Sequence, residues 1–197
     1  MRIAPPNSGS ATRDYIAVAR GSDLVVIRVI GKGNMLTAPG LSDFADQQRK
    51  AGFKRFVFDL ERCTGLDSTF MGVMVAMHSG FRERGASNRM SAQPPADSIE
   101  STPPELLDNA HAVSAVNVPP HIRDVMAMLG VDKFVKMRGS CDLKPLETTI
   151  LPEKNIAADE RRRLIIKAHE TLVEIDKRNQ AQFGAFLESL AAEIEKE

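Results

Sequence analysis

One stretch constrains the fold of this chain more than any other, and it spans residues 54–81. Large apolar residues alternate in residues 54–60, which is the pattern of a strand buried in a sheet. A D-S-T turn at residues 67–69 then leads into residues 70–81, which are apolar around most of a helical circumference. A buried strand, a tight turn and a buried helix in succession indicate an α/β domain.

The same alternation of strand and helix continues on both sides of this stretch. Six further elements are expected: strands at residues 15–20 and 24–30 that form an antiparallel hairpin, a helix at 41–50 that ends at Gly52, a strand at 112–118, a helix at 122–129, and an edge strand at 134–137. The segments between them are short except for one. Residues 86–110 are rich in proline and serine and poor in large apolar side chains, so they are interpreted as an inserted loop.

These patterns predict one principal domain with additions at both ends. The predicted organisation is a flexible N-terminus at residues 1–14, the α/β domain at 15–144, a linker at 145–156 and a C-terminal helical extension at 157–197. The chain of 197 residues, 43% of them hydrophobic, is long enough for one good core.

The C-terminal extension reads as a long amphipathic helix. Its apolar stripe recurs by threes and fours, at Ile165, Ala168, Leu172 and Ile175, and then drifts to Phe183, Phe186, Leu190 and Ile194. A continuous helix of this length would extend roughly 60 Å, so it must break, pair or project, and Gly184 is the expected break. Two alternatives stay open: a helix that dimerises or docks a partner, with Asn179 as a register-setting polar position, and a hairpin folded onto its own domain.

Charge and composition exclude several functions. Lysine plus arginine and aspartate plus glutamate number 26 each, so no net field gathers nucleic acid or anionic lipid. No stretch approaches the roughly 20 apolar residues of a membrane span, and the first 14 residues lack the apolar core of a signal peptide. A cytoplasmic protein is expected. Cys63 and Cys141 have neither disulfide-framework nor zinc-site spacing.

The sequence does not point to an enzyme. Its four histidines are scattered, none at metal spacing with another ligand, and GxSxG, HExxH and P-loop motifs are absent. No sequence neighbour of Ser68 would deprotonate it, although triads can assemble from distant residues. We therefore expect no catalytic residue, metal or cofactor.

The D-S-T turn has a structural and a regulatory interpretation. Asp67 or Ser68 can simply cap the helix that follows. Alternatively, a phosphoryl group on Ser68 would be tolerated there, because the first amides of a helix lack internal partners and carry a partial positive charge. Such a group would also change the surface charge abruptly.

Three stretches together carry a resemblance to a known family. They are IGKGNMLTAPGL from Ile30, FVFDLERCTGLDSTFMGVMV from Phe56 and SAVNVPPHIRDVMAMLGVDKFV from Ser114. With the order of elements over residues 15–138, they resemble the STAS domain of bacterial anti-sigma factor antagonists. The resemblance implies an α/β fold with a mixed sheet of four or five strands flanked by helices. It further implies binding to an anti-sigma factor that is a serine kinase of histidine-kinase-like ATPase fold, phosphorylation of Ser68 by that partner, and a phosphatase that restores binding.

A partner surface follows from the resemblance and from the turn chemistry. It would combine the loop at residues 34–39 with the first turn of the second helix, and its predicted residues are Asn34, Thr37, Asp67, Ser68, Thr69, Phe70 and Met71. Thr69 is the second choice for phosphorylation. Phe70 stands where the family has glycine, and it either anchors a partner or fills the core. The alternative function is a STAS adaptor that is never phosphorylated, in a signalling scaffold or a transport complex.

Overall fold

The computed structural model describes residues 13–21, 24–84, 112–141 and 148–194, with the backbone alone for residues 79–84 and 194. The predicted insertion at residues 86–110 and nearly all of the predicted flexible N-terminus lie outside the described residues.

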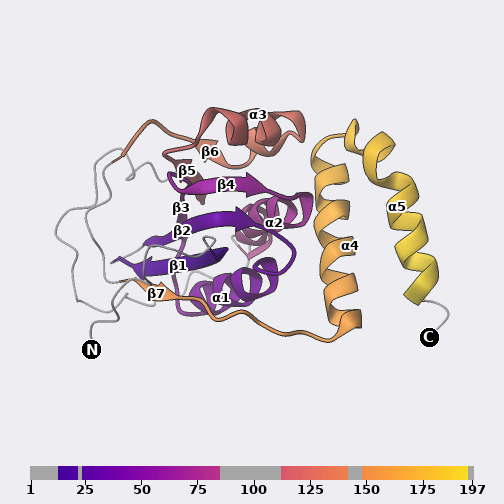
Figure 1. The fold of residues 1–197 in the computed structure, drawn as a ribbon, viewed down its shortest axis with the longest axis horizontal. Helices are drawn as coiled ribbons and strands as arrows, with labels where there is room; N and C mark the ends of the chain where they lie inside the picture. The colour runs from indigo at the N-terminus through magenta and orange to yellow at the C-terminus, as the bar shows by residue number, and fades with distance from the viewer. Residues whose placement is uncertain (1–12, 22–23, 85–111, 142–147, 195–197) are drawn as a thin grey trace.

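A mixed sheet forms the centre of the molecule (Figure 1). Its strands are β1 (Tyr15–Arg20), β2 (Leu24–Gly33), β3 (Arg55–Asp59), β5 (Val113–Val116), β6 (Lys136–Met137) and β7 (Thr149–Ile150), in the spatial order β6-β5-β3-β2-β1-β7. Strands β2, β3, β5 and β6 run parallel to their neighbours in this group, whereas β1 is antiparallel to β2 and to β7. A seventh strand, β4 (Cys63–Leu66), pairs with the last residues of β2.

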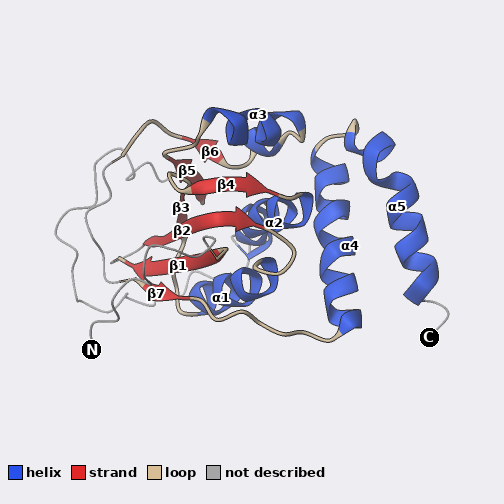
Figure 2. Cartoon of the chain, in the orientation of Figure 1, coloured by secondary structure: helices blue, strands red, loops and turns tan. Residues whose placement is uncertain are grey.

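Five α-helices and a short 3-10 helix are among the described elements (Figure 2). They are α1 (Ala38–Lys50), α2 (Ser68–Arg84), α3 (Pro120–Met128), η2 (Val131–Lys133), α4 (Ala158–Ile175) and α5 (Asn179–Ile194). None of the helices within the described ranges combines the length and the apolar character needed to cross a membrane.

The predicted α/β fold is confirmed, and the sheet is larger than predicted. The hairpin β1–β2, the buried strand β3, the helix α2 and the short edge strand β6 lie where the sequence places them. Strands β4 and β7 were not predicted. Because β7 lies in the segment interpreted as a linker and pairs with β1, the chain leaves the domain along its sheet edge.

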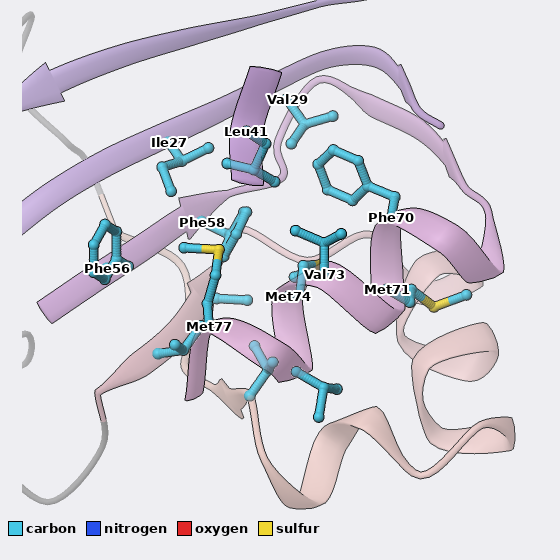
Figure 3. Packing of buried hydrophobic residues seen from close by; sticks show 14 of the residues in the cluster. Ile27, Val29, Leu41, Phe56, Phe58, Phe70, Met71, Val73, Met74 and Met77 are labelled. Atoms are coloured by element: carbon cyan, nitrogen blue, oxygen red, sulfur yellow. The ribbon is translucent and has the colours of Figure 1, made fainter. Parts of the chain in front are cut away.

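The main core lies between the sheet and helices α1, α2 and α3. Alternate residues of β3, Phe56 and Phe58, face this core, whereas Val57 faces the opposite side of the sheet and packs with Val116. Figure 3 shows the Phe70 ring pointing toward the sheet beside Val29. Its ring contacts that of Phe58 edge to face, with centroids 6.4 Å apart.

The C-terminal extension is a hairpin of two helices rather than one long helix. The predicted break at Gly184 is wrong: the chain turns between Ile175 and Asn179, and Gly184 lies inside α5. In Figure 1, α4 lies between α5 and the rest of the molecule, and α4 packs on α2. Leu172 of α4 and Phe183 of α5 belong to the main core, so the hairpin folds back onto its own domain.

Two polar residues fasten the turn of the hairpin to the domain. The Asp176 carboxylate accepts hydrogen bonds from Arg178 and, at 3.1 Å, from Lys133 Nζ at the end of η2. Asn179 Nδ2 donates to the backbone carbonyls of Leu129 and Leu172, at 3.0 and 2.7 Å. Both side chains are buried, so their hydrogen bonds form only when the turn of the hairpin lies against η2 and the end of α3.

Candidate functional site

Asp67 caps α2 and joins it to the loop that follows β2. Strand β4 runs beside the end of β2, and the Asp67 backbone N–H donates to the Gly33 carbonyl at 3.0 Å. The Asp67 carboxylate accepts from Phe70 N at 2.8 Å and from Met35 N at 2.7 Å. The first bond is an N-terminal cap, as the structural interpretation of the D-S-T turn predicted. The second fixes the loop at residues 34–37 against the helix start.

The loop itself is held by Asn34. Its Oδ1 accepts from the backbone N–H groups of Leu36 and Thr37, and its Nδ2 donates to Asp14 at 3.2 Å. The Thr37 hydroxyl turns inward and bonds the Asn34 backbone. As a consequence the loop presents apolar side chains outward: Met35 is 40% exposed and Leu36 is 52% exposed.

Ser68, the first residue of α2, contacts a histidine 101 positions away in the sequence. Its Oγ lies 2.8 Å from Nε2 of His169, which is on α4. His169 Nδ1 lies 2.8 Å from the Ile165 carbonyl oxygen, which can only accept, so Nδ1 carries a hydrogen. In the neutral ring, Nε2 is therefore an acceptor and the Ser68 hydroxyl donates to it.

The imidazole of His169 is enclosed by aromatic rings from the second helix of the hairpin. The rings of Phe183 and Phe186 meet it edge to face, with centroids 4.7 and 5.1 Å away, and His169 is buried. In enzymes, a serine hydroxyl bonded to a histidine can act as a nucleophile with the histidine as its base, and a third group orients the histidine. Here a backbone carbonyl occupies the position of the orienting carboxylate, and the aromatic enclosure makes the pair part of the packing between α2 and the hairpin.

Close approach of α4 to α2 depends on Gly72. A Cβ at residue 72 would lie 2.7 Å from Ala168 Cα and closer still to the Ala168 carbonyl oxygen. Glycine costs about 1 kcal/mol relative to alanine inside a helix, so the backbone contact explains a residue that α2 alone would disfavour. Ala168 and His169 are neighbours, and the same crossing that needs Gly72 delivers the imidazole to Ser68.

Beyond this crossing, α4 diverges from the domain. A cleft of about 500 Å³ lies between α1, α2 and α4. Its lining carries charged side chains from both sides: Asp46 and Arg49 from α1, and Lys167, Glu170 and Glu174 from α4. The hairpin therefore packs on the domain through its apolar side chains, with charged side chains lining the cleft beside this contact.

The predicted partner-binding residues fall into two groups. Asn34, Asp67 and Ser68 are partly exposed. The other four, Thr37, Thr69, Phe70 and Met71, are buried. Phe70 fills the core and packs over Gly33, whose lack of a side chain makes room for the ring. The grouping of these seven residues as a partner surface stays a prediction.

Sequence reasoning missed the contact of His169 with Ser68 and the role of Gly72. The one available signal for Gly72 was a glycine in the middle of an otherwise apolar helix.

The His78 ring on α2 packs edge to face against the ring of Phe134, with centroids 5.8 Å apart. Burial raises the pKa of the Cys63 thiol, which keeps it protonated and unreactive at neutral pH.

Over the ranges that the structure covers, no group of three or more His, Cys, Asp or Glu side chains is placed to hold a metal ion.

No family model and no curated protein sequence matches the chain. Solved structures that are similar to it include the protein TM1081, determined by NMR, at 12% identity and a TM-score of 0.46 over 70% of this chain and 91% of that one. An anti-sigma factor antagonist from Mycobacterium paratuberculosis has 17% identity and a TM-score of 0.42 over 64% and 85%. The anti-sigma factor antagonist SpoIIAA in its unphosphorylated form has 12% identity and a TM-score of 0.42 over 67% and 91%. The strand order and the helices beside the sheet are those of the mixed α/β fold that the sequence predicted.

Proposed function

We propose that this protein is an anti-sigma factor antagonist, a protein-binding regulatory module that is switched by phosphorylation of Ser68. The observation that carries the proposal is the position of Ser68: it opens α2 immediately after the capping Asp67, and the same carboxylate holds the adjacent 34–37 loop. A phosphoryl group there would lie at a helix N-terminus and beside a loop suited to contact a partner.

Two details favour Ser68 over Thr69 as the modified residue. Ser68 is partly exposed and its hydroxyl points out of the α/β core toward α4. Thr69 is 4% exposed and faces the packed interior, where a phosphoryl group would be buried without solvent. Thr69 therefore stays the second choice.

The proposed partner surface also includes two residues that the sequence did not single out. Met35 and Leu36 are exposed apolar side chains next to Asp67, and exposed apolar side chains that cluster on one loop are typical of protein contacts. The partner in this proposal is an anti-sigma factor that is also a serine kinase of histidine-kinase-like ATPase fold, and a phosphatase reverses the modification. The protein acts in the cytoplasm and is not itself an enzyme.

The test is direct. The protein is incubated with ATP and each candidate kinase from its own genome, and phosphate is located by mass spectrometry in the wild type, in Ser68→Ala and in Thr69→Val. We expect phosphate on the wild type and on Thr69→Val only. Phosphate on another residue, or no phosphate with any candidate kinase, contradicts the proposed phosphorylation switch.

Binding supplies the second measurement. Ser68→Ala should retain the partner, whereas Ser68→Asp should lose affinity for it by a factor of about a hundred, since a charge placed in a desolvated contact must be compensated by an opposite charge or the complex dissociates.

Replacing Met35 and Leu36 together by alanine should weaken binding without lowering the stability of the fold, because both side chains are exposed.

One observation favours the second candidate, an adaptor that is never phosphorylated. The Ser68 hydroxyl is already bonded to His169. An adaptor would bind equally well as Ser68→Ala and Ser68→Asp, so the same pair of variants separates the two functions.

A further inference from the structure

The surface around Ser68 is occupied by the chain itself. Helix α4 crosses the first turns of α2, with Ala168 against Gly72 and His169 on Ser68. A kinase must place the hydroxyl of its substrate in line with a phosphate donor, and a hydroxyl that donates to a buried imidazole cannot be so placed. In this conformation, then, α4 blocks access to Ser68.

We infer that the α4–α5 hairpin is a displaceable cap that controls access to Ser68, and that phosphorylation and the closed position of the hairpin exclude each other. The inference rests on the proposed function, in which Ser68 is the modified residue. It adds a regulatory element that belongs to this chain: a pair of helices that competes with the partner for the start of α2.

The hairpin is attached in a way that suits opening as a unit. At its turn, Asp176 and Asn179 bond to η2 and to the end of α3, and these contacts lie away from Ser68. Along its length, α4 buries Ala168, His169 and Leu172, and its partly buried Leu164, Val173 and Ile175 pack against the main core. The charged cleft lies between α4 and α1, and Lys154 forms ion pairs with Asp43 of α1 and Glu160 of α4. The hairpin contributes fewer fully buried side chains than β3 and α2 do, so it can open while the sheet stays closed.

Phosphorylation would act on the contact that holds the cap. In the kinase reaction, Ser68 Oγ forms a bond to the γ-phosphorus of ATP as the bond to the β–γ bridging oxygen breaks. ADP leaves, and the hydroxyl proton passes to a base on the kinase. The Oγ of the resulting phosphoserine carries no hydrogen, so the bond from Ser68 Oγ to His169 Nε2 is lost. In the closed position, Ser68 Oγ and His169 Nε2 are 2.8 Å apart and the imidazole is enclosed by Phe183 and Phe186, so there is no room between them for a phosphoryl group. A phosphoryl group on Ser68 and the closed position of α4 therefore exclude each other.

Hydrogen exchange of the full chain, followed by mass spectrometry, tests the cap without any partner. Phosphoserine is incorporated at residue 68 during synthesis, and exchange is compared with that of the wild type. We expect the amides of α4 to exchange at least about tenfold faster in the phosphorylated protein, the size expected when a hydrogen bond and its packing are lost. Amides of β3 should keep their protection. Phosphoserine at residue 189, on the exposed side of α5, is the control for added charge and should leave α4 unchanged.

A second variant opens the cap without touching Ser68. Gly72→Ala inserts a Cβ against the Ala168 backbone, while alanine favours the α2 helix itself. We expect faster exchange in α4 with β3 unaffected. Gly139→Ala is the matched control, because nothing lies within 4 Å of a Cβ at that position.

Two results would overturn the cap. The first is α4 protection equal to that of the wild type in both the phosphorylated protein and Gly72→Ala. The second is increased protection of α4 with phosphoserine 68, which would mean that the phosphate strengthens the closed position. Neither depends on a kinase, so these outcomes are separable from a failure to find phosphate on Ser68 in the kinase assay above.

Discussion

A single carboxylate, that of Asp67, connects two parts of the candidate site. One oxygen caps α2 through Phe70 N, and the other holds the 34–37 loop through Met35 N. Asp67→Ala removes both acceptors, so we expect a loss of about 2 kcal/mol in the free energy of unfolding. Urea denaturation measures it. The exposed Asp124 on α3 is the matched control, and Asp124→Ala should change stability by less than about 0.5 kcal/mol.

If Asp67→Ala unfolds at the same urea concentration as the wild type, the cap is replaced by water and the loop is not fixed by this residue. That outcome would contradict a stabilising role for both hydrogen bonds of the Asp67 carboxylate.

The elements of this fold differ in how readily their sequence predicts them. Helix α2 and strand β3 carry clear periodicity, whereas β4 has four residues with a glycine among them, and β7 has two. Strands this short are specified by their partners in the sheet and not by their own pattern. The turn between α4 and α5 likewise lacks glycine and proline, so it carries no local breaking signal.

The contact between Ser68 and His169 was beyond sequence reasoning for the same physical reason. It depends on where a hairpin lands after folding back, and that position is set by the long-range bonds of Asp176 and Asn179 and by the glycine that lets α4 approach α2. The choice of Ser68 as the candidate site residue needed the local turn chemistry and the family resemblance of the flanking sequence. The identity of the residue that covers it needed the whole fold.

The attachment of the hairpin should depend on pH through Asp176. Its hydrogen bonds to Arg178, followed by that to Lys133, hold the pKa of this carboxyl well below its usual range. Because the folded protein binds the proton more weakly than the unfolded chain, this contribution is complete above the ordinary aspartate pKa of about 3.9 and is lost as the pH falls further. Asp176→Asn should therefore be less stable than the wild type at pH 7.

Urea unfolding of both proteins between pH 7 and pH 3 checks this expectation. The gap in unfolding midpoint between wild type and Asp176→Asn should narrow below about pH 4, where the carboxyl of the unfolded wild-type chain begins to take up its proton while that of the folded protein does not. The corresponding change at the exposed Asp159, Asp159→Asn, should leave the midpoint nearly unchanged throughout. A constant gap for Asp176→Asn would mean that the charge of Asp176 does not stabilise the fold.

At the scale of the whole molecule, the hairpin decides between a monomer and a dimer. The apolar stripe that could have joined two chains is used internally, since Leu172 and Phe183 lie in the core of the same chain. Phe186 is the one large apolar side chain of the described hairpin that remains more than a third exposed. Stable dimers bury roughly 800 Å² on each partner, which one ring cannot supply. We expect light scattering after gel filtration to give the monomer mass of 21.6 kDa at tens of micromolar protein.

The competing arrangement is an exchange of hairpins between two chains, in which His169 of one chain would reach Ser68 of the other. It would preserve every contact described here and double the mass. A dimer whose proportion rises with concentration would contradict the monomer, and mixing tagged with untagged protein would then distinguish exchange from simple association. Slow formation of mixed dimers indicates exchange, because each hairpin must leave its core before it can join another.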